Sequence, residues 1–477
     1  MAPYNRYNGW LPADPAVYRA FIDGLFTHAI KRKYAPGAAA ATDSELLDEF
    51  GDDIDANITA EIGGRHHECV RQFGIAIVKN RVMFDLFENI FKQASQPQLA
   101  ERKIESFKDL LYLLDVIVSE PPKFQPAHGA IPEPVGVPMY LLFDILSNTA
   151  AAYDLFRMKE FNKAMADLLN CWGKYLQGPG SDSSLNPGPG GWFSPAAISM
   201  LQANDRGSFN ETYVVPNPEA PNRGYASWDA FFTREVQENA RPLELLPGYE
   251  RDRMVFNACE STVERWRYRV KAHDRFWLKG MPYSLYDIFL NEVSAKNEAE
   301  KRTARKFAEE TANVFVGGTV YQAFLSPQDY HRWRSPIDGV VKSAYRIPGT
   351  YYAVLPDEGF YPDEPEDVEP SGALIRCQPW LTVAATRAVF IIEGSKHIGR
   401  VAFVAIGMCE VSSCDITVKE GKEVKAGEEL GMFHFGGSSH VVIFNPEAKI
   451  RLLNEEGIVR IGNHLKVKSA LAVSTAK

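Results

Sequence analysis

Hydrophobic residues in the first part of the chain recur at the spacing of amphipathic helices. They return every three or four positions over residues 82–94 and 104–119, which predicts one helix in each segment. Residues 43–50 predict another helix, because an Asp-Ser pair of the kind that caps helices precedes the apolar positions. Residues 139–165 predict one or two more. The first part of the chain is therefore expected to be mainly helical.

The pattern changes in the second part of the chain. After Pro242, short runs rich in Val, Ile and Phe alternate with Gly, Pro and Asp, which is typical of strands joined by turns. Residues 179–191 are rich in Pro, Gly and Ser, and they predict a linker between the two patterns. We expect an α+β protein with a helical N-terminal domain over residues 1–190 and a β-rich domain over residues 191–477.

The composition is that of an ordinary globular protein. The chain has 477 residues, of which 45% are hydrophobic and 24% charged, and it is long enough for two or three domains. A net charge of −9 and the absence of any Lys/Arg-rich block argue against nucleic acid as a partner. No apolar stretch is long enough to span a membrane, and the N-terminus lacks a signal-peptide core. A cytoplasmic protein without an integral membrane segment is expected.

The cysteines and histidines do not predict a metal site. Six cysteines are scattered along the chain without CxxC pairs, which suits free thiols in a reducing compartment better than disulfides or zinc. His66 and His67 lack metal-type spacing to a nearby pair of cysteines or carboxylates, and we interpret them as solvent-facing helix surface.

The candidate chemistry lies at residues 436–439 (GGSS), between two apolar runs. Glycine tolerates the backbone angles that would let the Ser438 hydroxyl attack the carbonyl of Gly437. An N→O acyl shift and an elimination would then cut the chain between these residues, and hydrolysis with loss of ammonia would convert Ser438 into a pyruvoyl group. Such a carbonyl can condense with a substrate amine and accept the electrons of a breaking C–CO₂ bond. Taken alone, however, the same four residues are typical of an ordinary turn.

Other segments favour the catalytic interpretation. They are residues 228–234 (WDAFFTR), 276–280 (FWLKG), 325–332 (LSPQDYHR) and 432–439 (MFHFGGSS). Together they resemble the phosphatidylserine decarboxylase family of pyruvoyl enzymes, in order and at suitable spacing. The resemblance covers about residues 225–470 and implies a zymogen that cuts itself before residue 438.

A closer likeness extends over nearly the whole chain. Residues 8–11 (NGWL), 191–193 (GWF) and 258–261 (ACES) resemble the soluble fungal branch of the family, which includes L-tryptophan decarboxylases of secondary metabolism. This likeness implies a carboxy-lyase that releases CO₂ and an amine from a free L-amino acid, first of all an aromatic one like tryptophan. Decarboxylation of phosphatidylserine to phosphatidylethanolamine is the alternative.

The resemblance implies roles for individual residues. Ser438 is the expected pyruvoyl precursor, and Gly437 contributes the scissile carbonyl. Ser439 could donate a hydrogen bond to the oxyanion that develops there, or be a simple turn residue. His331 is the candidate acid or base at the substrate α-carbon once CO₂ has left. Glu260 stands where the family has an aspartate, which would orient a partner histidine.

Arg334 departs from the family pattern, which has a second histidine at this position. A guanidinium stays protonated, so Arg334 cannot take the Ser438 proton. We expect an ion pair between Glu260 and Arg334, and Arg334 could also bind the substrate carboxylate. His331, or His440 on the same strand face as Ser438, would then take the proton. If neither does, the chain stays uncut and is a non-catalytic relative.

Two further expectations concern modules and partners. Residues 418–430 share the strand-and-turn texture of biotinyl and lipoyl carrier domains, but they lack the Met-Lys-Met turn that such carriers modify. A carrier module is therefore the weaker alternative. For a decarboxylase, the expected partner is a small-molecule amino acid, the cleaved α and β chains stay associated, and a homo-oligomer is compatible with the sequence.

Overall fold

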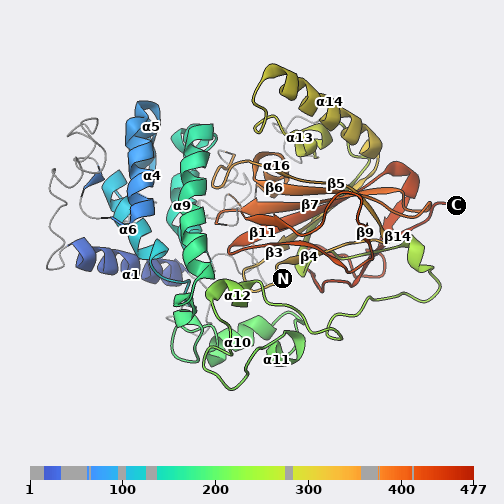
Figure 1. Ribbon diagram of the computed structural model, residues 1–477, viewed down its shortest axis with the longest axis horizontal. Helices are drawn as coiled ribbons and strands as arrows, with labels where there is room; N and C mark the ends of the chain where they lie inside the picture. The colour runs from blue at the N-terminus through green and yellow to red at the C-terminus, as the bar shows by residue number, and fades with distance from the viewer. Residues whose placement is uncertain are drawn as a thin grey trace. The chain divides into compact units, whose positions relative to one another are not determined.

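The computed structural model describes residues 15–33, 62–63, 66–94, 104–124, 137–273, 283–355, 374, 377–410 and 413–477 (Figure 1). The chain divides into two compact units. The first comprises Met1–Ala197, Ala226–Trp228 and Tyr352–Cys377, and the second comprises Ile198–Tyr225, Asp229–Tyr351 and Gln378–Lys477. The first unit is helical and the second rich in strands, which confirms the α+β class. The domain ranges 1–190 and 191–477 stay a prediction.

The helices of the first unit follow the hydrophobic periodicity. Helices α5 (Arg81–Ala94) and α6 (Phe107–Val118) confirm the segments predicted over 82–94 and 104–119. The Ser106 side chain caps α6 by accepting a hydrogen bond from the backbone N–H of Asp109, 3.2 Å away. The unit also contains α1 (Pro15–Lys33), α4 (Glu68–Lys79) and a 3₁₀ turn, η3 (Ser181–Ser184). The helix predicted over 43–50 lies outside the described residues.

Three helices, rather than one or two, begin within residues 139–165 or next to them. They are α7 (Pro138–Ser147), α8 (Ala150–Leu155) and α9 (Lys159–Gln177). The extra break occurs at Thr149, which is extended and whose hydroxyl accepts a hydrogen bond from the Ala152 N–H. A helix that continued through Thr149 could not have this cap.

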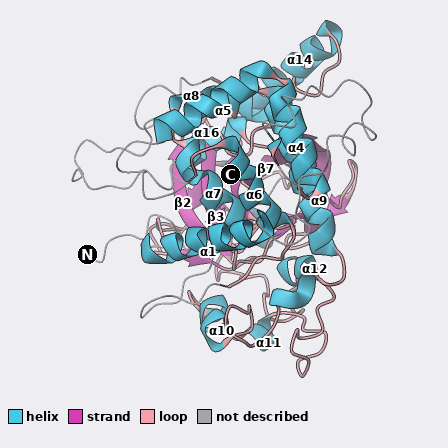
Figure 2. Ribbon diagram, turned by 90° about the vertical axis from the view of Figure 1, so that its left-hand side faces the viewer, coloured by secondary structure: helices cyan, strands magenta, loops and turns pink. Residues whose placement is uncertain are grey.

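Phenylalanine rings from α5, α6 and α9 form the core of the first unit. Figure 2 shows the ribbons of these three helices. The Phe87 ring on α5 lies 5.0 Å from that of Phe107 on α6 and 6.1 Å from that of Phe161 on α9. All three side chains are buried, and α4 packs against both α6 and α9. Burial of these rings stabilises the helices far more than their intrinsic propensity does.

An eight-stranded sheet dominates the second unit. Its neighbouring strands pair antiparallel, in the order β13-β2-β3-β11-β7-β6-β5-β9. The strands in that order are β13 (His464–Leu465), β2 (Ser261–Tyr268), β3 (Thr319–Leu325), β11 (Gly437–Phe444), β7 (Arg400–Met408), β6 (Arg387–Glu393), β5 (Gly339–Ile347) and β9 (Glu423–Val424).

Two three-stranded sheets and several helices complete the second unit. One sheet has the order β1-β14-β12 and the other β4-β10-β8. Their strands are β1 (Met254–Phe256), β14 (Ala470–Ser474), β12 (Ile450–Leu452), β4 (Arg332–Arg334), β10 (Glu429–Phe433) and β8 (Cys414–Ile416). The helices are α11 (Phe209–Thr212), α13 (Leu285–Phe289), α14 (Glu298–Phe315) and α16 (Gln378–Ala384), with 3₁₀ turns η4 (Arg251–Arg253) and η5 (Pro446–Ala448). Helices α10 (Pro195–Gln202) and α12 (Trp228–Phe232) contain residues of both units.

Strand β11 is central to the large sheet and is buried along its whole length. It lies between β3 and β7 (Figure 1). Val442 and Phe444 point into one core cluster together with Phe403 of β7, while Val441 and Ile443 are buried on the other face. A strand covered on both faces reads as a continuous apolar run rather than as an alternation.

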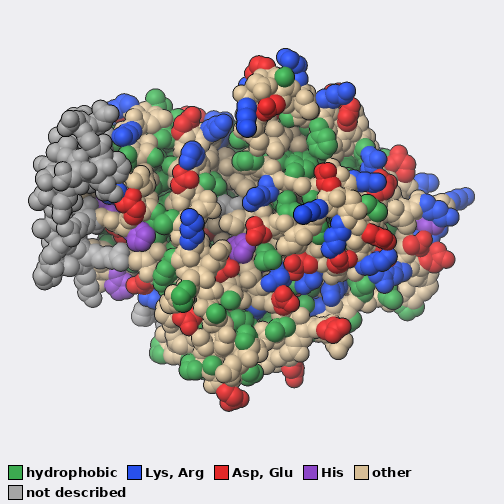
Figure 3. All heavy atoms as spheres, viewed as in Figure 1, with side chains coloured by type: hydrophobic (Ala, Val, Ile, Leu, Met, Phe, Trp, Pro, Cys, Tyr) green, Lys and Arg blue, Asp and Glu red, His purple; other side chains and the backbone are tan. Residues whose placement is uncertain are grey.

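The surface of the described residues carries both signs of charge. On the face drawn in Figure 3, Lys and Arg side chains are interspersed with Asp and Glu. Exposed pairs such as Arg251–Asp338 and Lys422–Glu428 show the same mixing at the level of single contacts. None of the helices described has both the length and the hydrophobicity that a membrane span requires.

Candidate active site

The peptide bond that is expected to break joins the first two residues of β11. Gly437 pairs with Met408 of β7, and Ser438 pairs with Leu325 of β3 and Gly407 of β7. Just before the strand, Gly436 has φ 130°, a conformation that side chains other than glycine rarely adopt. The first glycine of the pair is thus required by the turn that leads into the strand.

The two serines face opposite sides of the sheet. Strand alternation places Ser438 and His440 on the same face as Val442, as expected. Ser439 is on the other face, in register with Phe324 and Ile406. Its suggested hydrogen bond to the oxyanion stays a prediction, and the strand geometry gives it no support.

Several polar atoms in this region are buried without a hydrogen-bond partner among the described residues. They include Oγ of Ser438 and of Ser439, Nε2 of His331 and Nδ1 of His440. These four side chains are completely inaccessible to solvent. Most buried polar atoms in native proteins are hydrogen-bonded, so a group of such exceptions marks a candidate site of chemistry.

His331 is held as a neutral base. Its Nδ1 lies 3.0 Å from the backbone carbonyl of Asp329. A carbonyl only accepts hydrogen bonds, so Nδ1 carries the proton and Nε2 keeps its lone pair. The ring stacks on Phe232 at a centroid distance of 4.2 Å, and burial lowers the pKa of His331 to about 3. The imidazole is therefore uncharged at neutral pH and able to accept a proton.

His440 is a second buried and neutral histidine. Its Nε2 lies 3.1 Å from the hydroxyl oxygen of Ser261, and its ring lies between those of Tyr321 and Phe403, at 5.9 Å and 5.8 Å. Burial lowers the pKa of His440 to about 3. His440 therefore combines two properties that a base for Ser438 needs, a lone pair and a position on the same strand face.

The predicted ion pair between Glu260 and Arg334 is wrong. Glu260 instead forms a bidentate pair with Arg241, with distances of 3.1 Å from Nε and 2.7 Å from Nη2, and accepts the Val467 N–H at 3.2 Å. It contacts no histidine in the described part of the chain, so the structure gives no support to its expected orienting role.

The pairing of β4 with β10 explains which residues Arg334 contacts. Arg334 on β4 stands in register with Glu429 on β10, and its Nη2 lies 3.8 Å from that carboxylate. The same nitrogen donates a hydrogen bond to the Tyr330 hydroxyl. A carboxylate on the neighbouring strand is thus nearer to Arg334 than the one predicted from the family motif.

Asp329, within the matched segment 325–332, is a buried carboxylate that contacts a histidine, His464. It accepts hydrogen bonds from Nε of Arg206 and Nε2 of His464, both at 2.8 Å, and from the backbone N–H and hydroxyl of Ser326. Burial alone would raise its pKa, but Arg206 and His464 hold the pKa of Asp329 well below its usual value. In the sequence, only its position two residues before His331 indicates that Asp329 belongs to the site. Its partners Arg206 and His464 lie far away in the chain.

His434, in the turn before Gly436, lies between two carboxylates. Its Nδ1 is 2.9 Å from Asp229, and its Nε2 is 3.2 Å from Asp415. Burial alone would lower its pKa, but the hydrogen bonds and charges of the two aspartates raise the pKa of His434 above its ordinary value. A protonated ring donates on both sides and so holds the turn in place.

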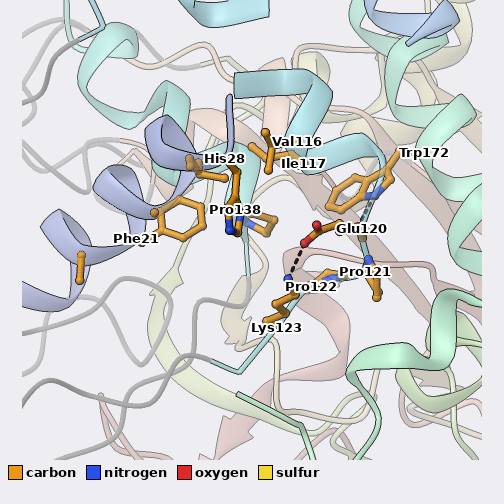
Figure 4. Close-up of a pocket in the computed structure, with 13 residues that line it drawn as sticks. Phe21, His28, Val116, Ile117, Glu120, Pro121, Pro122, Lys123, Pro138 and Trp172 are labelled. Carbon is orange, nitrogen blue, oxygen red and sulfur yellow. Dashed lines mark hydrogen bonds and ion pairs between the residues drawn. The ribbon is translucent and has the colours of Figure 1, made fainter. Parts of the chain in front are cut away.

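A separate cavity of about 230 Å³ lies in the first unit, and Figure 4 shows its lining. Phe21, Val116 and Trp172 contribute apolar surface, and the lining also includes Glu120 and Lys123, which form an ion pair. No residue of the Ser438 region lines this cavity. The segment 276–280, which the resemblance to the family includes, lies outside the described residues.

Comparisons with known proteins show the family to which the chain belongs. The family model for phosphatidylserine decarboxylase matches residues 228–468, and a second phosphatidylserine decarboxylase model matches residues 67–201. Decarboxylase iboD of Amanita muscaria is 48% identical over 369 residues, which cover 76% of this chain and 99% of the relative.

More distant relatives differ in how much of the chain they match. The L-tryptophan decarboxylase of Psilocybe cubensis is 27% identical over 99% of this chain and 95% of its own length. Phosphatidylserine decarboxylase proenzyme 3 of Schizosaccharomyces pombe is 28% identical over 48% of this chain and 20% of its own length. These relatives are decarboxylases, and this chain is a carboxy-lyase that belongs to the phosphatidylserine decarboxylase family.

Proposed function

We propose that the chain is a pyruvoyl-dependent decarboxylase of a free L-amino acid, with an aromatic, tryptophan-like substrate as the first candidate. The L-tryptophan decarboxylases match this chain almost from end to end, whereas the phosphatidylserine decarboxylase proenzymes match about half of it. A cytoplasmic location and a role in fungal secondary metabolism belong to the same proposal.

The observation that carries the proposal is the buried, unpartnered hydroxyl of Ser438 on the same strand face as a neutral histidine. A hydroxyl without a hydrogen-bond partner is free to approach the preceding carbonyl, and His440 or His331 would receive its proton. The attack of the Ser438 hydroxyl on the Gly437 carbonyl requires unusual backbone angles. Gly436, directly before these residues, already has a positive φ of 130°. These residues fit a serine that becomes a pyruvoyl group.

The pyruvoyl group would supply an electrophilic carbonyl that accepts electrons from the breaking C–CO₂ bond. The chain's own residues would do the rest. Neutral His331 would hold the proton that the substrate α-carbon needs after CO₂ leaves, at Nε2, because Nδ1 is occupied by the Asp329 carbonyl. Arg334 remains a candidate for binding the substrate carboxylate, although Tyr330 and Glu429 already contact it.

Intact-mass spectrometry of the purified protein tests self-cleavage directly. A cut chain gives two masses, one ending at Gly437 and one that covers residues 438–477 and begins with a pyruvoyl group. A single mass of 53.4 kDa in freshly purified and in aged protein would contradict the proposal. It would favour a non-catalytic relative, the alternative that Arg334 raises.

The substrate is tested on the cut protein by CO₂ release. L-Tryptophan, a panel of other free L-amino acids and liposomes that contain phosphatidylserine are assayed side by side. We expect release from a free amino acid, with tryptophan first, and none from the liposomes. Release from the liposomes alone would overturn the proposed substrate class but keep the pyruvoyl chemistry.

A further inference from the structure

Three metal-binding side chains of the first unit come together, and none of them belongs to the Ser438 region. Nδ1 of His67, Sγ of Cys69 and Sγ of Cys171 all lie within 4.8 Å of one another. The distance from His67 Nδ1 to Cys69 Sγ is 3.1 Å. His67 directly precedes α4, Cys69 lies in its first turn, and Cys171 lies on α9, which packs against α4.

We propose that His67, Cys69 and Cys171 form a zinc site that ties α4 to α9. Two thiolates and an imidazole are ligands that Zn²⁺ prefers, at about 2.3 Å for sulfur and about 2.0 Å for nitrogen. In a tetrahedral site with such bonds, the ligand atoms lie roughly 3.5–3.8 Å apart. The observed spacing therefore needs only small side-chain rotations to reach that geometry.

The position of His67 is fixed by a buried carboxylate. Asp115 on α6 is 2% exposed, and it accepts the backbone N–H of His67 at 2.8 Å through one oxygen. The other oxygen contacts Nδ1 of the neighbouring His66. His66 is thus occupied, whereas the His67 ring is directed to the cysteines. An anchored backbone at the first ligand lowers the entropic cost of assembling the site.

Solvent can reach the ligands. His67 is exposed, Cys171 is half-buried and Cys69 is 8% exposed. Three protein ligands leave the fourth tetrahedral position to a water molecule. Burial and the neighbouring Cys171 raise the pKa of the Cys69 thiol. Binding of Zn²⁺ would form two S–Zn bonds and one N–Zn bond and release two thiol protons, without any oxidation.

The test uses the full chain, stripped of metal, kept under a reducing agent and then loaded with Zn²⁺ alone. We expect one zinc per chain after gel filtration, proton release on titration, and thiolate charge-transfer bands when Co²⁺ replaces Zn²⁺. His67→Gln and Cys171→Ser each remove a ligand, so each should weaken binding by at least the roughly 10–100-fold that loss of an outer-shell partner costs. Cys414→Ala is the matched control, because it removes a buried thiol of the second unit and should leave zinc uptake unchanged.

Several results would overturn the proposal. The reduced wild-type chain could retain no zinc, His67→Gln and Cys171→Ser could bind as tightly as wild type, or Cys414→Ala could lose zinc equally. A disulfide between Cys69 and Cys171 in a chain that takes up no zinc when reduced would assign the two thiols to redox chemistry instead. His67 is exposed, so its substitution should not unfold the chain, and circular dichroism checks this.

Discussion

The turn before β11 and the strand itself shift the pKa values of two histidines in opposite directions. His434 in the turn faces Asp229 and Asp415, and these carboxylates raise its pKa. His440 on the strand meets aromatic rings and the hydroxyl of Ser261, and burial lowers its pKa to about 3. The two carboxylates favour a positive charge on His434 in the turn, whereas the strand interior holds a neutral base at His440. A histidine can take the Ser438 proton only if it is neutral, so the contrast suits self-cleavage.

The largest effect is expected from replacing each of the two serines of β11 by alanine in turn. Ser438→Ala removes the attacking oxygen, so the chain should stay at 53.4 kDa and release no CO₂. Ser439→Ala removes a hydroxyl from the opposite face and should still be cut. Intact mass and CO₂ release check both variants. Equal loss in the two variants would mean that the hydroxyl of Ser439 takes part after all.

The next largest effect is expected from replacing the two neutral histidines, His331 and His440, which should change different steps. His331→Gln should lower kcat by about 10²–10⁴, the usual contribution of a positioned acid or base, but leave the chain cut. His440→Gln should instead slow the appearance of the fragment that begins at residue 438. A time course of intact mass and the kcat of the fully cut protein give the two readouts. If His331→Gln blocks cleavage and His440→Gln does not, the two roles are reversed.

The charged turn gives a smaller effect that depends on pH. The folded-state pKa of His434 is raised above 6.5, so its contribution to stability is complete below pH 6.5 and is lost as pH rises through the folded value. Asp229→Asn should reduce the free energy of unfolding by about 1 kcal/mol below pH 6.5, and by less well above it. Urea unfolding at several pH values measures this difference.

Asp415→Asn is the matched control for the turn, because its carboxylate is 57% exposed and its hydrogen bond to His434 is longer. It should change the stability less than Asp229→Asn does. A loss from Asp229→Asn that is the same at every pH would show that the turn does not depend on a protonated His434.

The smallest effect is expected at Arg334. Arg334→His restores the residue type of the family, but position 334 faces Glu429 and Tyr330. We therefore expect the cleavage rate to stay within about threefold of the wild type, as for other substitutions at partly exposed sites. The rate is followed by denaturing gel. A large acceleration would show that the imidazole reaches Ser438 and that Arg334 limits processing.

The hydrophobic pattern of the sequence predicted several helices, whereas the partners of the site residues depend on contacts between distant parts of the chain. The helices at 82–94 and 104–119 follow from their apolar periodicity. Helix α14 was not predicted, because its buried face is small: Ala308, Ala312 and Phe315 are its buried residues, among many charged ones. A short apolar stripe is a weak signal.

The charged partners of the site could not be predicted in the same way. Glu260 was expected beside Arg334 because both belong to the same family motifs, yet the register of β4 with β10 gives Arg334 the carboxylate of Glu429. Asp329 binds Arg206 and His464, which are distant in sequence. Cys171 reaches Cys69 only because α9 packs on α4. No local spacing encodes these pairings.

The position of β11 also decides what a cut chain would look like. Backbone ladders hold this strand to β3 and β7, and the strands after it are shared between two sheets, with β13 beside β2 and β14 between β1 and β12. Cleavage after Gly437 would leave two polypeptides in place of one. The interface between them would be the hydrophobic core of the second unit. Neither dilution nor salt would separate the two polypeptides, and they would migrate as one species in every native separation until denaturant melts the fold.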